Sequence, residues 1–105
     1  MATDPIDDDE PAFAVTVYSI MDRYRTGKVE HRTACRALSA ITLALAPDHL
    51  LNEAAEHRLG IFFAERLDVY RDGPDPEAVK HEVVRVIRAA AETDWDTLGQ
   101  YGLHR

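Results

Sequence analysis

Helix-breaking residues divide this chain at regular intervals, and they constrain its fold more than any other feature of the sequence. Gly27, Pro47 and the Gly73-Pro74 pair separate stretches in which apolar residues recur with the spacing of an α-helix. The helices would be joined by connections of about two to five residues, which force consecutive helices to be antiparallel neighbours. We therefore predict an all-α fold, built as a compact antiparallel four-helix bundle.

The first two helices are predicted over residues 11–26 and 30–46. Apolar residues from Phe13 to Tyr24 have helical spacing. Phe13, Val15 and Val17 also alternate, which leaves a short strand over residues 12–18 open as an alternative. Gly27 occupies the place of a left-handed cap after the first helix. The second helix is apolar nearly all round in its C-terminal half, so this half lies at the centre of the bundle or under a partner.

The third and fourth helices are predicted over residues 48–70 and 76–93. Asp48 and Asp75 are candidate N-caps, and Pro76 suits the first helical position. Gly60 costs a helix about 1 kcal/mol relative to alanine, so a kink or break in the third helix stays open. The fourth helix has the clearest apolar face, formed by Val79, Val83, Val86, Ile87 and Ala90. A short C-terminal turn anchored by Trp95 is expected to pack back on the bundle.

The predicted domain organisation follows from the length of the chain and from its acidic first ten residues. Residues 1–10 hold five acids and little apolar surface, which predicts a flexible acidic tail. Residues 11–105 form a single helical domain, since 105 residues is the size of one domain. The start lacks the basic and apolar regions of a secretory signal, and no apolar run is long enough for a bilayer. With a single cysteine, we expect a cytoplasmic protein with no membrane association.

Charge is distributed unevenly along the chain. The net charge is −7, which excludes a general polyanion binder that works by overall charge. Residues 23–36 nevertheless hold five bases and one acid, Glu30. This basic corner is the candidate partner-binding site, suited to an acidic protein surface or to phosphates. The alternative is a solvated corner neutralised by the acidic tail. Its members are Arg23, Arg25, Lys28, Arg32 and Arg36.

Three patterns suggest metal ligands, but each favours an ordinary structural role. His31 and Cys35 lie four residues apart without the further ligands that zinc needs. His49, Glu53 and His57 also recur every four residues, yet this order matches no known metal motif and is typical of a solvated face. The segment that starts at Asp22 has too few carboxylates for a calcium loop, with Tyr24 and Thr33 at ligand positions. We therefore expect no metal and no cofactor.

Catalytic motifs are also missing from the sequence. Cys35 would need a nearby base such as His31, and the sequence shows no nucleophile elbow or glycine-rich phosphate loop. Paired carboxylates such as Glu53 and Glu56 are more typical of a solvated face.

The leading hypothesis is a non-catalytic protein–protein interaction module that regulates, adapts or inhibits a partner. Small inhibitors encoded by phages or plasmids share this size and class, an analogy at the level of fold alone. The alternative is a nucleic-acid-associated transcriptional regulator that uses the basic corner. A weaker alternative is a small metal- or Cys-dependent enzyme. Homodimerisation stays open, because the second and third helices carry more apolar surface than one packed layer uses.

Overall fold

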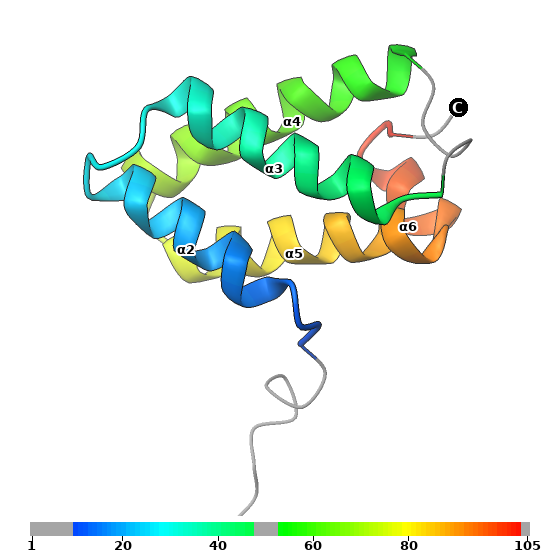
Figure 1. Cartoon of the computed structure of the whole chain (residues 1–105), viewed down its shortest axis with the longest axis horizontal. Helices are drawn as coiled ribbons and strands as arrows, with labels where there is room; N and C mark the ends of the chain where they lie inside the picture. Colours follow the sequence, from blue (N-terminus) through cyan, green and yellow to red (C-terminus); the bar gives the residue numbers. More distant parts are fainter. Residues whose placement is uncertain (1–9, 48–52, 104–105) are drawn as a thin grey trace, which may run out of the picture.

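The computed structural model describes residues 10–47 and 53–103. Within these ranges it contains five helices and no strand (Figure 1). The predicted all-α class is confirmed. The helices are α2 (Ala14–Arg25), α3 (His31–Leu45), α4 (Glu53–Asp72), α5 (Pro76–Glu92) and α6 (Trp95–Gln100). None of these helices combines the length and apolar character that a membrane-crossing segment needs.

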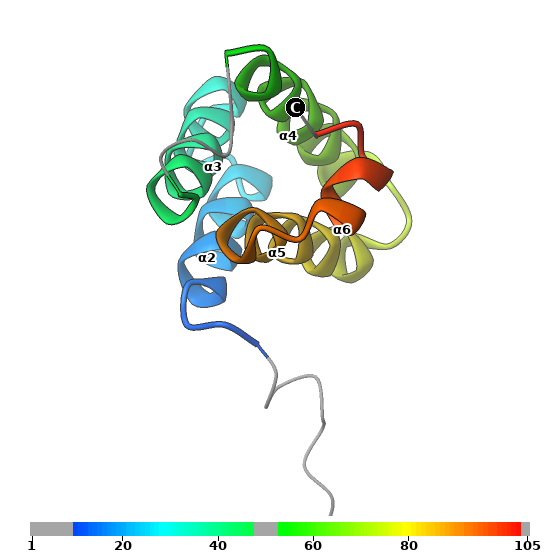
Figure 2. The same ribbon diagram turned by 90° about the vertical axis from the view of Figure 1, so that its right-hand side faces the viewer.

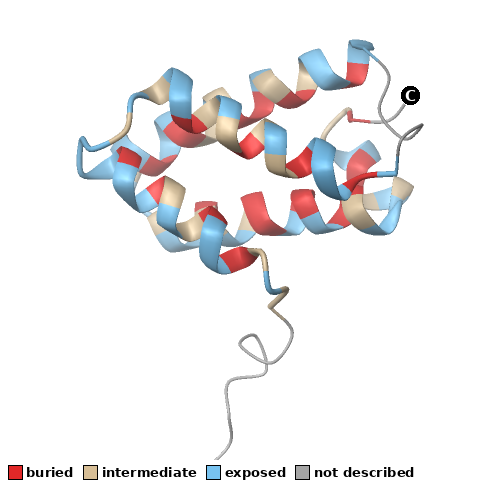
Figure 3. Cartoon of the chain, in the orientation of Figure 1, coloured by how far each residue is buried: buried red, intermediate tan, exposed pale blue. Residues whose placement is uncertain are grey.

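The four long helices surround one apolar core. Helix α3 packs against α2, α4 and α5, and α4 also packs against α5. Figure 2 shows the four helices placed around this common interior, and in Figure 1 consecutive long helices run in alternating directions. Buried positions face inward along every long helix, as the colouring of Figure 3 shows. The largest fully buried side chains include Met21, Leu38, Leu59, Phe63, Leu67, Tyr70 and Ile87.

Helix α2 starts three residues later than predicted. Ala12 and Phe13 form a turn, which is closed by a hydrogen bond from the Ala14 amide to the Pro11 carbonyl at 3.0 Å. Residues 14–18 are helical, so the strand alternative was wrong. Val15 alternates with buried Val17 because it lies on the outer side of the helix, where 74% of its surface is exposed.

Helix α4 continues without a break through Gly60 and ends at Asp72. Neighbours on both sides of the glycine, Leu59 and Phe62 among them, are buried and hold the helix in the core. Such packing outweighs the roughly 1 kcal/mol that glycine costs a helix. Asp48, the predicted N-cap of this helix, lies outside the described residues.

The capping prediction for α5 is confirmed. The Asp75 carboxylate accepts a hydrogen bond from the Ala78 amide at 3.1 Å, and Pro76 follows as the first helical residue. The whole predicted apolar face of α5 is buried. After α5, Asp94 caps the short helix α6, which packs against α5. Leu98 and Leu103 are the buried anchors of this segment, whereas Trp95 is only partly buried.

Candidate functional site

The predicted basic corner is built around the turn that joins α2 to α3. Gly27 adopts a φ of +81°, and its amide donates to the Tyr24 carbonyl at 3.1 Å while the Lys28 amide donates to the Arg23 carbonyl at 2.8 Å. These two bonds form a Schellman motif, whose left-handed residue is most easily a glycine. The turn brings the last turn of α2 against the first turns of α3. The predicted left-handed cap is therefore confirmed, and it positions the corner.

All five residues of the basic corner are exposed, but they do not share one surface. The Arg25 guanidinium lies 5.5 Å from the centroid of the Tyr70 ring, on the side of α2 that faces α4 and α5. Arg23, two residues earlier, lies on the side of α2 that faces α3. Since two residues turn a helix by about 200°, the two arginines point in nearly opposite directions. Arg25 therefore does not join the other cations.

Four members of the corner have side chains that contact no acid. In the described part of the chain, no ion pair or hydrogen bond is formed by the side chains of Arg23, Lys28, Arg32 or Arg36. Every other lysine and arginine in these ranges contacts an acid, a carbonyl, a phenol or an aromatic ring. Examples are Arg66 with Glu82 at 3.1 Å, Lys80 with Glu77 at 3.2 Å and Arg58 with the Gly102 carbonyl at 2.7 Å.

An open groove of about 450 Å³ lies between α2 and α3, and Arg23 is the one member of the basic corner in its lining. Its lining is mainly apolar, with hydroxyl groups from Thr16, Ser19 and Thr33. This groove was not predicted from the sequence. Its signal in the sequence is Val15, an apolar residue that does not fit the helical spacing of the buried face. The strand alternative had assigned this residue to an alternating pattern with Phe13 and Val17. Besides the hydroxyl-bearing residues, the groove is lined by Val15, Ile20, Arg23, Val29 and Ala37.

His31 and Cys35, which lie at metal-ligand spacing but were expected to have an ordinary structural role, both contact α4. His31 Nε2 lies 3.0 Å from the Ala64 carbonyl oxygen and 3.2 Å from Asp68 Oδ1, so the ring joins α3 to α4. The Cys35 thiol donates to the Gly60 carbonyl at 3.3 Å, and burial raises the pKa of this thiol. A raised pKa keeps the sulfur protonated and therefore weakly nucleophilic at neutral pH. Both side chains thus hold α3 against α4.

The other metal and carboxylate candidates are not assembled into a site. The Asp22 carboxylate accepts a hydrogen bond from the Tyr70 hydroxyl and lies 3.7 Å from Lys80 Nζ, which turns it away from the Gly27 turn. Glu53, Glu56 and His57 are exposed on the first turns of α4, and His49 lies outside the described residues. Across the residues that are placed, no group of three His, Cys, Asp or Glu side chains could hold a metal ion.

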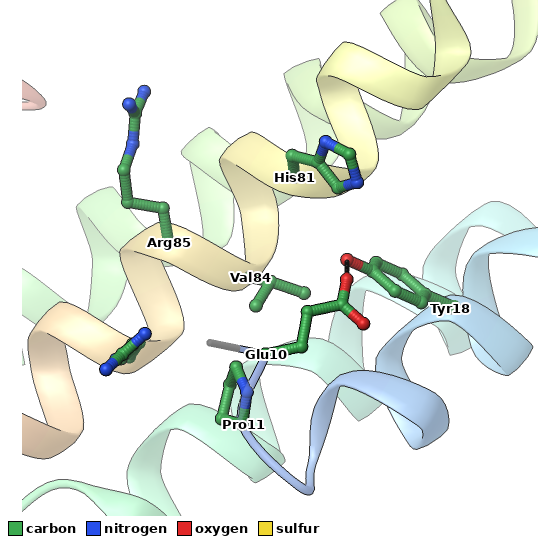
Figure 4. Close-up of a pocket in the computed structure, with 7 residues that line it drawn as sticks. Glu10, Pro11, Tyr18, His81, Val84 and Arg85 are labelled. Carbon is green, nitrogen blue, oxygen red and sulfur yellow. Dashed lines mark hydrogen bonds between the residues drawn. The ribbon is translucent and has the colours of Figure 1, made fainter. Parts of the chain in front are cut away.

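A second pocket, of about 250 Å³, lies between α2 and α5 (Figure 4). The Glu10 and Tyr18 side chains turn toward each other there, and the tyrosine hydroxyl donates to the carboxylate. Arg85 on its edge donates to the Tyr101 hydroxyl at 2.7 Å. Because its charged groups already have partners within the chain, this pocket is a weaker candidate than the α2–α3 groove. The spacing of His81, Arg85 and Arg88, which places them on one side of α5, is its signal in the sequence.

Comparison of the chain with protein-family models, with curated proteins and with solved structures found no match.

Proposed function

We propose that this chain is a non-catalytic protein–protein interaction module, an antiparallel four-helix bundle that binds an acidic surface of a partner protein through the α2–α3 groove. Binding would regulate, adapt or inhibit that partner. The proposal includes a cytoplasmic location, which suits a lone cysteine held as a thiol.

The observations that support it most are four exposed cations without acidic contacts around the α2–α3 turn and the first turns of α3, and an apolar groove between these helices that Arg23 lines. In a chain with net charge −7, acids are abundant, and the other described cations contact their own chain. Arg23, Lys28, Arg32 and Arg36 therefore keep their full capacity to pair with acids from outside. Charge complementarity of this kind raises association rates and selects partners. Burial of the apolar floor of the groove adds a hydrophobic contribution to the free energy of binding.

The groove favours a protein over a nucleic acid. A phosphate backbone is recognised by cations and amides and gains little from an apolar floor such as that of Val15 and Ile20. The net charge of −7 also opposes approach to DNA or RNA. Recovery of nucleic acid is therefore the outcome that would favour the transcriptional-regulator alternative.

The test is an affinity pull-down from a host lysate treated with nuclease, with the double variant Arg32→Glu/Arg36→Glu compared with the wild type. We expect the wild type to recover a dominant protein partner. The double variant should recover at least tenfold less of this partner. The variant should fold normally, because both positions are exposed and glutamates near the N-terminus of α3 suit the helix dipole. Its melting temperature should stay within about 4 °C of the wild type.

The matched control is Arg85→Glu/Arg88→Glu, which makes the same change in net charge on exposed positions of α5. Retention of the partner by this control and loss by the α3 variant would assign binding to the groove. Equal loss in both variants would show a general charge effect and contradict the proposed site.

A further inference from the structure

Lys28 is the accessible one of the two lysines in this sequence, since it is exposed on the α2–α3 turn. We propose that Lys28 is a modification site, at which the side-chain amine is acylated by small acyl phosphates. The product is a neutral amide, so the modification removes one of the four cations without acidic contacts. Its effect on partner binding rests on the proposed function, whereas the acylation itself does not.

The fold presents the Lys28 amine to solvent on a turn whose backbone is well defined. Lys28 directly follows Gly27, the left-handed residue of the Schellman motif, and its amide donates to the Arg23 carbonyl at 2.8 Å. Within residues 10–47 and 53–103, the Lys28 side chain forms no ion pair, hydrogen bond or aromatic contact. A carbonyl carbon can therefore approach Nζ of Lys28 without the loss of any contact in the folded chain.

Lys80 on α5 is the internal comparison. Its Nζ lies 3.2 Å from Glu77 Oε2 and 3.7 Å from Asp22 Oδ1, and it lies 5.1 Å from the centroid of the Tyr18 ring. Only 14% of the Lys80 side chain is exposed. Acylation at this position would remove both ion pairs and would require the donor to enter a largely enclosed site. The fold thus protects Lys80 and leaves Lys28 open to reaction.

The reaction needs an acyl donor with a good leaving group, which an acyl phosphate supplies. The unprotonated Nζ of Lys28 attacks the carbonyl carbon of the donor, and a C–N bond forms while the C–O bond to phosphate breaks. Phosphate leaves with the electron pair of that bond, and the nitrogen releases a proton to solvent. The products are an amide on Lys28 and inorganic phosphate, so the step needs no oxidant or reductant.

The charges around Lys28 favour this anionic donor. The hydrogen bond between their backbones places Arg23 next to Lys28, and Arg32 lies in the first turn of α3. Glu30 is the one acid between residues 23 and 36. This local excess of positive charge attracts an acyl phosphate more than a neutral donor. Guanidinium groups stay protonated in proteins, so Lys28 is the one member of the basic corner whose charge acylation removes.

The experiment treats the full chain with acetyl phosphate and follows the acetylation of each lysine by mass spectrometry. We expect Lys28 to be acetylated at least tenfold faster than Lys80. In urea that unfolds the chain, the two rates should agree within about twofold, because the contrast comes from burial and ion pairing in the fold. Equal rates in the folded chain, an unchanged contrast in urea or no acetylation of Lys28 would overturn the inference.

A neutral donor tests the role of the surrounding cations. We expect about 0.5 M salt, and separately Arg32→Glu/Arg36→Glu, to slow the acetylation of Lys28 by acetyl phosphate several-fold. The same changes should leave the reaction with the neutral N-hydroxysuccinimide ester of acetic acid nearly unchanged. Equal slowing with both donors would overturn the assignment of an acyl phosphate as the donor.

The pull-down separates the modification from the proposed function. Wild-type protein acetylated at Lys28 should recover several-fold less partner than untreated protein, because one cation of the basic corner is lost. Treatment of the Lys28→Arg variant should cause no such loss, since arginine does not accept the acetyl group. Equal recovery by treated and untreated wild type would overturn the effect on binding. Failure of the untreated wild type to recover a partner would contradict the proposed function, while the acetylation rates would still decide the modification site.

Discussion

Among the described residues other than glycine, Thr93 has the most strained backbone. Its φ of 58° and ψ of 40° place it in the left-handed region after α5, where a β-branched residue is disfavoured by roughly 1–2 kcal/mol. Glycine relieves this strain, although it loses more conformational entropy on folding. We expect Thr93→Gly to raise the free energy of unfolding by about 0.5–1 kcal/mol in urea denaturation.

The matched control at this scale is Thr26→Gly at the end of α2. Thr26 has a φ of −87°, and its hydroxyl donates to the Asp22 carbonyl at 3.0 Å. Glycine gains nothing at this φ and loses the hydrogen bond, so the free energy of unfolding should fall by about 1 kcal/mol. A gain in stability from both substitutions would show that the sign of φ does not explain the effect.

At the scale of the helix, Gly60 in the middle of α4 and Gly73 directly after its end should respond oppositely to substitution by alanine. A Cβ atom at Gly60 would meet nothing within 4 Å, so Gly60→Ala should stabilise α4 by about 1 kcal/mol. A Cβ atom at Gly73 would lie 2.5 Å from the Val69 carbonyl oxygen, which itself accepts the Gly73 amide at 2.7 Å. Gly73→Ala should therefore lower the free energy of unfolding by about 1–3 kcal/mol. Thermal and urea denaturation of both variants measure this, and a stabilised Gly73→Ala would contradict the close contact.

The helices were largely predictable from the sequence because breakers and caps act locally. Asp75 and Gly27 perform their predicted roles through hydrogen bonds to residues only three positions away. The unbroken path of α4 through Gly60 was not predictable, since it depends on the packing of buried neighbours from other helices. Propensity alone could not supply that information.

The candidate site was predictable only in part. Charge clustering identified the basic corner, but the sequence does not show which side of α2 faces which neighbour. Arg23 and Arg25 were therefore grouped although they lie on opposite sides. The groove could not be predicted, because Val15 and Val17 look alike until the packing buries one of them and exposes the other.

At the scale of the whole molecule, a polar cluster joins three helices at one end. Asp22 on α2 accepts the Tyr70 hydroxyl from α4 and lies 3.7 Å from Lys80 Nζ on α5. Lys80 also pairs with Glu77 at 3.2 Å, and its ammonium lies 5.1 Å from the centroid of the Tyr18 ring. Only 14% of the Lys80 side chain is exposed, so these contacts are partly shielded from solvent. The cluster thus links elements that are far apart in sequence.

This cluster predicts how the stability of the molecule depends on alkaline pH. Burial, with a further contribution from the Asp22 carboxylate, raises the pKa of Tyr70 to about 12, against 10.0 for an ordinary tyrosine. The folded chain therefore keeps the Tyr70 proton at pH values where the unfolded chain has lost it. The stability that this proton gives is complete below pH 10 and is lost as the pH rises toward 12, by an amount on the order of 2 kcal/mol.

Urea denaturation at a series of alkaline pH values measures this loss, with Tyr70→Phe as the comparison. The phenylalanine variant should be less stable near neutral pH, because Asp22 loses its hydrogen bond, but its stability should fall much less between pH 10 and 12. Tyr24 and Cys35 contribute to the smaller loss that remains, since burial raises the pKa of both groups as well. Parallel curves for the wild type and the variant would show that Tyr70 does not couple proton binding to folding. Divergence over that interval would show that burial of Tyr70, together with its contact to Asp22, holds the proton of Tyr70 in the folded chain, and that this proton helps hold α2 and α4 together.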